Sequence, residues 1–122
     1  MRDFMFLFRF KDGFDGGSTS REGFRKEAMK WQAWTEKLLK EGRLTPGSRL
    51  SMSGKVIDGV KKHMHDGPFA EGKEVVGSFC TVKARDLEEA LEFAKECPIL
   101  DQDGSVEVRE IVRAKINDNE SE

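Results

Sequence analysis

The sequence predicts an α+β domain of the ferredoxin-like, split βαβ type, in which two βαβ units are joined by a hairpin. Three observations lead to this class. Residues 3–11 alternate Phe with other side chains, as strands do. Residues 20–41 and 86–97 have apolar side chains at helical spacing. Strand-like segments follow each of these helices. We therefore expect an antiparallel sheet with both helices on one face.

Length and composition limit the possible classes of protein. The 122 residues are the size of one domain, and a 37% hydrophobic share is enough for one core. A net charge of −2 does not suggest a nucleic acid or an anionic membrane as partner. The chain has no apolar run near the roughly 20 residues of a membrane span, and we expect no signal peptide, because the first apolar run is only five residues long. We expect a cytoplasmic domain over residues 1–114 and a disordered acidic tail over 115–122.

The first strand, residues 3–11, has two alternating sets of side chains. One set is Phe4, Phe6, Phe8 and Phe10, and the other is Met5, Leu7, Arg9 and Lys11. The strand is therefore apolar on both faces at its start. One layer of helices covers only one face. We expect a second copy of the sheet to cover the other, which gives a homodimer.

The first helix is predicted over residues 20–41. It begins with a capping-box pattern in which Thr19 is the N-cap and Glu22 reaches back to it. Gly42 follows the last turn, and Pro46 lies a few residues further on. The apolar stripe is formed by Phe24, Ala28, Trp31, Thr35 and Leu38.

The middle of the chain is less regular. A short strand is predicted at 49–52 and a β-hairpin over 54–65, with an Asp-Gly turn. Residues 66–69, Asp-Gly-Pro-Phe, predict a turn. The strongest strand is 74–83, and Gly77 inside it indicates a bulge or a close approach to the backbone.

The last βαβ strand follows the second helix. Asp86 is in the N-cap position of this helix, and Pro98 ends it. A final strand is predicted over 105–113, with Val106 and Val108 facing the same way. The two cysteines, Cys80 and Cys97, are too few for a disulfide framework and match no zinc spacing.

The candidate catalytic residues are Asp66, His65 and His63. The two histidines are two positions apart and share a face if they lie on a strand. They could hold a metal, but no third ligand is evident, so we expect a solvated strand and no metal. Asp66 with a histidine could act as a general base and its orienting carboxylate. Alternatively, Asp66 caps the turn by accepting a backbone N–H bond.

The candidate ligand-binding residues surround a pocket predicted between the first helix and the sheet. Trp31 and Trp34 either pack helix against sheet or form a wall on which a ligand stacks. Arg49 either meets an anionic ligand or joins a surface ion pair. Asp66 and Gly77 are expected at the mouth. The full set is Phe8, Trp31, Trp34, Arg49, Phe69 and Gly77. No phosphate-loop or dinucleotide-binding motif is present, so we expect no cofactor.

The segment DGPFAEGKEVVGSF, residues 66–79, resembles the DGPF-motif branch of the YCII-related proteins. The resemblance extends to the Phe-rich first strand, to the helix with its two tryptophans and to residues 98–109. It implies a ferredoxin-like α+β domain that forms dimeric α/β-barrel assemblies.

The resemblance also implies a His–Asp site, in which Asp66 matches the Asp of the motif. One branch of the family contains a dehydrochlorinase that acts on hydroxylated aromatics, and its histidine lies in the region of the first helix. Residues 20–41 contain no histidine here, so only His63 or His65 could replace it.

Two functions follow. The first is a homodimer that binds a small organic molecule, such as an aromatic, with cofactor-free lyase or isomerase chemistry in which Asp66 or a nearby histidine moves a proton. The second is a non-enzymatic domain that senses a ligand or binds a partner, because DGPF proteins occur beside or fused to extracytoplasmic-function sigma factors. A cavity that holds both Asp66 and an aromatic wall would favour the first.

Overall fold

The computed structural model describes residues 1–11, 21–68, 70–71 and 74–112. The predicted Thr19 cap, Phe69 and the acidic tail lie outside these residues. The elements, in order, are β1 (Arg2–Lys11), α1 (Arg21–Lys40), β2 (Leu44–Arg49), β3 (Gly54–Asp58), β4 (His63–Gly67), β5 (Ala70–Glu71), β6 (Glu74–Ala84), α2 (Leu87–Lys95), the 3-10 helix η1 (Pro98–Gln102) and β7 (Ser105–Glu110).

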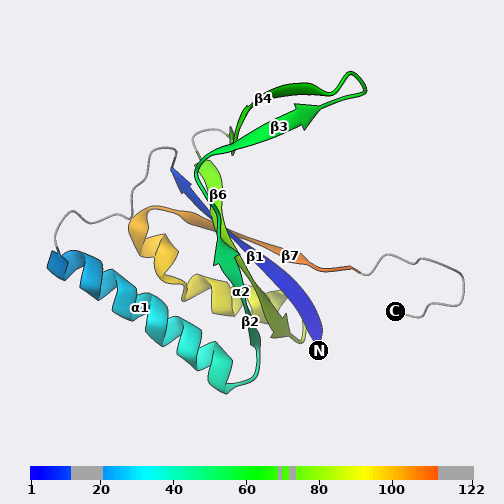
Figure 1. The fold of residues 1–122 in the computed structure, drawn as a ribbon. Coiled ribbons are helices and arrows are strands. Elements are labelled where there is room, and N and C mark those ends of the chain that lie inside the picture. The colour runs from blue at the N-terminus through cyan, green and yellow to red at the C-terminus, as the bar shows by residue number, and fades with distance from the viewer. Residues whose placement is uncertain (12–20, 69, 72–73, 113–122) are drawn as a thin grey trace, which may run out of the picture.

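The main sheet has the strand order β2-β6-β1-β7, and the short β5 pairs with β6. Every pairing in it is antiparallel. The units β1-α1-β2 and β6-α2-β7 are the two interleaved βαβ units of a ferredoxin-like fold. Figure 1 shows α1 and α2 on the same side of this sheet. The predicted α+β class and its split βαβ arrangement are therefore confirmed.

The alternation in β1 separates the two faces of the sheet. Phe4, Phe6 and Phe8 are all buried and form the centre of the core. Both helices pack on this Phe face: α1 contributes two buried side chains to the core and α2 contributes Ala90 and Ala94. The two from α1 are Trp34 and Leu38.

The opposite face of the sheet carries the other half of β1. In the register with β6, Leu7 lies beside Phe79 and Met5 beside Thr81. Met5, Leu7 and Phe79 are half-buried and belong to no part of the described core. An ion pair of 2.8 Å between Arg9 and a β7 glutamate lies beside them. We call this surface, centred on Met5, Leu7 and Phe79, the open face.

The second helix is held by its N-terminal residues. The Asp86 carboxylate accepts a hydrogen bond of 2.9 Å from the backbone N–H of Glu89, which confirms the predicted N-cap. The Glu89 carboxylate in turn accepts bonds from the Arg85 backbone N–H and from the Arg43 guanidinium, both at 2.9 Å. The Arg85 N–H, followed by Arg43, lowers the pKa of Glu89. These contacts connect α2 to the residue just before β2.

The middle of the chain differs from the prediction in two places. The strand after α1 is β2, Leu44–Arg49, and only its last residue falls in the predicted segment 49–52. Pro46 is expected beyond the end of the first helix, but β2 is an edge strand of the sheet, where proline is tolerated. Asp66 lies in β4 and not in a turn, because its ladder with Lys55 of β3 continues to Gly67. The last strand ends at Glu110.

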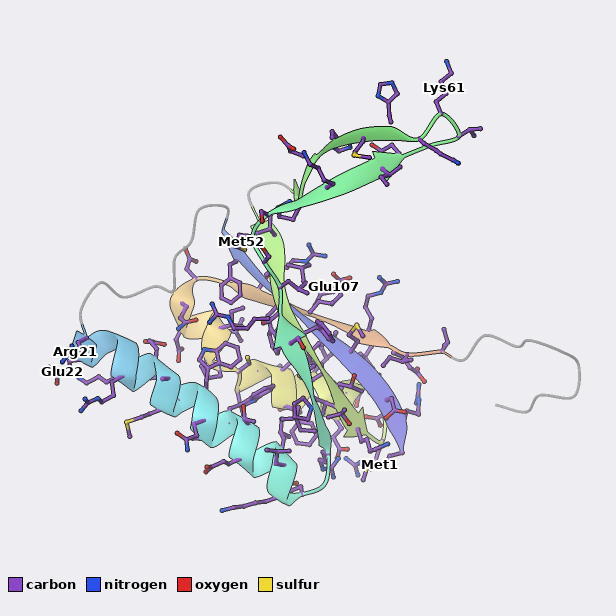
Figure 2. All side chains as sticks on the ribbon, viewed as in Figure 1. Met1, Arg21, Glu22, Met52, Lys61 and Glu107 are labelled. Atoms are coloured by element: carbon purple, nitrogen blue, oxygen red, sulfur yellow. The ribbon has the colours of Figure 1, made fainter. Side chains whose placement is uncertain are left out.

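The predicted hairpin exists and forms a second, separate sheet of β3 and β4. Figure 1 shows it projecting away from the main sheet and from both helices. In Figure 2, Met52 lies at its base and Lys61 at its far end. No helix within the described part of the chain has the length and apolarity needed to cross a membrane.

The predicted close approach at Gly77 is confirmed, and the group that approaches is Phe10. A Cβ at Gly77 would lie 2.5 Å from the Phe10 ring. We expect Gly77→Ala to lower the free energy of unfolding by about 1–3 kcal/mol, because the ring must shift in a packed region. Gly54→Ala, where a Cβ meets nothing within 4 Å, is the control and changes it by less than about 0.5 kcal/mol. Equal losses in urea unfolding of both variants would contradict this packing.

Candidate ligand-binding cleft

A cleft of about 210 Å³ opens between α1 and the edge of the sheet made by β2 and β6. Its floor is Phe8 of β1, and its walls come from α1 on one side and β2 on the other. The lining residues are Phe8, Trp31, Trp34, Thr35, Leu44, Pro46, Gly47, Ser48, Arg49, Ser78, Phe79 and Cys80. Most of this lining is apolar, and hydroxyl groups and one guanidinium supply the polar atoms.

Three aromatic rings of the lining hold one another edge to face. The ring centroids of Phe8 and Trp31 are 5.4 Å apart at 89°, and those of Trp31 and Trp34 are 6.1 Å apart at 86°. Phe8 and Trp34 complete the triangle at 6.1 Å and 84°. Edge-to-face contacts of this kind are favourable beyond the apolar area they bury. We call these three residues the aromatic wall.

The two tryptophans in the wall have different hydrogen bonding. The Trp34 indole N–H donates to the Phe93 carbonyl of α2 at 3.0 Å, and its ring packs against Phe6 and Phe8. Trp31 is half-buried, and its indole N–H has no acceptor among the described residues. Trp34 therefore serves mainly to pack helix against sheet, whereas Trp31 presents an unpaired donor at the cleft.

A β-bulge in β2 determines which face Arg49 occupies. Pro46 pairs with Cys80 and Arg49 pairs with Ser78, so β2 has one residue more than β6 between these two pairs. Without the extra residue, Ser48 would pair with Ser78, and Arg49 would point to the open face. The bulge thus places the Arg49 side chain on the cleft face of the sheet.

The bulge depends on close contact between two backbones. A Cβ at Gly47 would lie 2.0 Å from the Phe79 carbonyl oxygen, and that neighbour is backbone, which cannot move aside. Gly47 is the residue type that allows β2 to lie this close to β6. The shape of this wall of the cleft is therefore determined by the sequence Pro46-Gly47-Ser48.

Cys80 is the nucleophile in the lining, and its environment makes it inert. It is buried beside the aromatic wall, and burial raises the pKa of its thiol to about 12. Cys97, in the core, also has its pKa raised to about 12 by burial. Both cysteines are free, as expected. Since the thiolate is the reactive form, Cys80 is not an activated nucleophile.

We expect both thiols to resist alkylation at pH 8 while the protein is folded. A pKa about three units above the ordinary value of 9.0 lowers the thiolate fraction about a thousand-fold. Iodoacetamide labelling followed by mass spectrometry should give slow reaction in buffer and rapid reaction of both cysteines in urea. Rapid labelling of Cys80 alone in buffer would show that the floor of the cleft is open to solvent.

The predicted catalytic residues lie elsewhere, on the projecting hairpin. Asp66 is 86% exposed in its side chain and forms an ion pair with Lys55 across the ladder. The His65 ring donates from Nε2 to the Asp58 carboxylate at 2.6 Å, so its carboxylate partner is Asp58 and not Asp66. His63 and His65 share a strand face, as predicted, but the described residues contain no group of three or more metal ligands around them.

The structure thus separates the predicted site into parts. It brings Phe8, Trp31, Trp34 and Arg49 together in the cleft. The lining residues described do not include Gly77, where the Phe10 ring occupies the space, or any residue of the hairpin.

Sequence reasoning missed the β2 part of the lining, because Pro46-Gly47 suggests only the end of a helix. The Asp58–His65 contact was also missed. In the ladder Asp58 pairs with His63, so its contact with His65 is a diagonal one that a two-residue Asp58-Gly59 turn does not predict.

Comparison with known proteins finds a matching family and a similar solved structure. A family model described as the YCII-related domain matches residues 4–115. A search of curated proteins found no match. Among solved structures, the chain is similar to 5-chloro-2-hydroxyhydroquinone dehydrochlorinase (TftG) from Burkholderia phenoliruptrix AC1100 in complex with 2,5-dihydroxybenzoquinone. The two are 20% identical with a TM-score of 0.45, and the match covers 93% of this chain and 99% of that chain.

Proposed function

The chain belongs to the YCII-related domain family, and from this premise and the geometry of its cleft we propose that it binds a small aromatic molecule between α1 and the β2–β6 edge. The observation that carries the proposal is the aromatic wall of Phe8, Trp31 and Trp34, which forms one side of an open apolar cleft. Flat rings held in fixed orientation offer a planar ligand a surface that needs little reordering.

The volume of the cleft sets the size of the ligand. About 210 Å³ is below the range of about 300–1,000 Å³ that is typical of drug-sized ligands. An apolar cavity of about 150 Å³ is enough for benzene. A single substituted ring is therefore the ligand size that this cleft fits best.

The lining favours binding over catalysis. General acid–base chemistry needs a group that can move a proton within hydrogen-bond reach of the ligand. The described lining residues include no carboxylate and no imidazole, and the Cys80 thiol stays protonated. Asp66 and His65 are not among the described lining residues of the cleft, so within one chain they do not supply its acid–base group. We propose a ligand-sensing module, and lyase or isomerase chemistry is the second candidate.

Intrinsic fluorescence tests this proposal directly. The chain has two tryptophans and no tyrosine, and both tryptophans lie in the aromatic wall. A titration with single-ring aromatic compounds should change the emission on excitation at 295 nm, with saturation. Trp31→Ala should weaken binding at least about five-fold, because stacking of a ring on an aromatic side chain is worth roughly 1–3 kcal/mol. No saturable change with any ring compound would overturn the proposed function.

A substitution on the hairpin separates the two candidate functions. Asp66→Asn should leave the affinity for the same ring compounds unchanged, because Asp66 lies on the exposed hairpin and not in the lining. If this variant instead bound several-fold more weakly, a carboxylate of a second copy would have to reach the cleft. That result would favour the lyase or isomerase candidate.

We also propose that the protein is a homodimer that pairs through the open face. Its centre, Met5, Leu7 and Phe79, is apolar, and the Arg9–Glu107 ion pair borders it. An apolar centre with a polar rim is the usual anatomy of a protein interface. Two sheets that pack face to face about a two-fold axis would remove these side chains from water.

Measurement of the oligomeric state tests whether the open face is a dimer interface. Light scattering after gel filtration should give a mass of twice 13.8 kDa for the native protein. Leu7→Glu should give a monomer that remains folded, because a charge at the centre of the face opposes pairing but is solvated in a single chain. Leu39→Glu changes an exposed leucine of α1 in the same way and should remain a dimer. A monomeric native protein, or a dimer that survives Leu7→Glu, would contradict this interface.

A further inference from the structure

Arg49 differs in its partners from the other arginines on the strands of the main sheet. Arg2 and Arg9 form ion pairs of 2.7 Å and 2.8 Å with Glu110 and Glu107, and Arg109 lies 4.0 Å from Glu107. Arg49 has no carboxylate partner and no hydrogen-bond partner for its guanidinium among the described residues, although it lines the cleft. The cleft therefore contains one positive charge that no side chain of the described lining neutralises.

We infer that this charge makes the cleft selective for aromatic molecules that carry one anionic group of the carboxylate type, an inference that rests on the proposed function. A guanidinium offers parallel N–H donors that match the two oxygens of a carboxylate. The ring lies against the aromatic wall, and the carboxylate meets Arg49 at the β2 side.

The other polar groups of the lining are consistent with an anion. Thr35, Ser48 and Ser78 each bring a hydroxyl that can donate a hydrogen bond. Trp31 adds an indole N–H without an acceptor among the described residues. An aromatic wall can also attract an organic cation, but Arg49 would repel a cation and no described lining residue has a negative charge to offset that.

The bulge in β2 is the device that creates this selectivity. One extra residue between Pro46 and Arg49 turns the guanidinium from the open face to the cleft. The same change of face keeps a positive charge away from the apolar centre of the open face. The one extra residue in β2 therefore determines the charge of both the cleft and the open face.

Benzoate and benzamide are suitable probes, because they have nearly the same shape and differ in charge. In the fluorescence titration we expect the native protein to bind benzoate at least about ten-fold more tightly than benzamide. Arg49→Gln should remove this preference by weakening benzoate and leaving benzamide unchanged. Arg49→Lys should retain part of it, because the charge remains but the paired donors are lost. Arg25→Gln, an exposed position of α1, is the control for net charge and should have no effect.

The outcomes distinguish this inference from the function on which it rests. If benzoate and benzamide bind equally well, or if Arg49→Gln binds benzoate as the native protein does, the anionic selectivity is wrong and the ligand cleft stands. If neither probe nor any other ring compound changes the tryptophan emission, the proposed function fails as well. Deletion of Ser48 provides a second variant, and its folding is checked by thermal unfolding. A folded deletion variant that kept the benzoate preference would overturn the role of the bulge.

Discussion

The packing of alternate β1 phenylalanines against α1 is the interaction on which the other features depend. Phe6 and Phe8 lie under Trp34, with ring centroids 6.2 Å and 6.1 Å from it. The Phe8 ring also contacts Trp31, with ring centroids 5.4 Å apart, so the same aromatic cluster forms part of the core and the wall of the cleft. The wall is therefore a continuation of the core packing, with Phe8 and Trp34 buried and Trp31 packed against them. A ligand that binds there meets a preformed surface, which lowers the ordering that binding requires.

The position of β2 completes the cleft, and two local constraints set it. Pro46 is tolerated because β2 is the edge strand, and Gly47 lets the strand approach the Phe79 backbone. The bulge that follows places Arg49 on the cleft face. At its other end, β2 is held through Arg43, whose guanidinium donates to Glu89 of α2. The edge of the cleft is thus built from both βαβ units, although its residues come mostly from the first.

Most of the fold could be predicted from the sequence, because periodicity is a local property. The alternation in β1 and the helical spacing that includes Trp31 required no knowledge of distant contacts. The strand β2 could not be recognised, because Pro46-Gly47 indicates a break unless the strand is known to lie at the edge of the sheet. The position of Asp66 could not be predicted either. Its segment has turn residues, but pairing with Lys55 keeps it in a strand of the hairpin, which projects away from the main sheet (Figure 1). The sequence thus predicted the aromatic wall more reliably than the candidate acid–base group.

The proposed position of a small aromatic ligand against Trp31 can be tested with the two indole N–H resonances of a ¹⁵N–¹H spectrum. The Trp34 indole N–H is bonded to the Phe93 carbonyl, whereas that of Trp31 has no acceptor among the described residues. On addition of benzoate, we expect a large, saturable shift of the Trp31 resonance and a smaller shift of the Trp34 resonance. A spectrum in which neither resonance moves, while residues of the β3–β4 hairpin do, would contradict it.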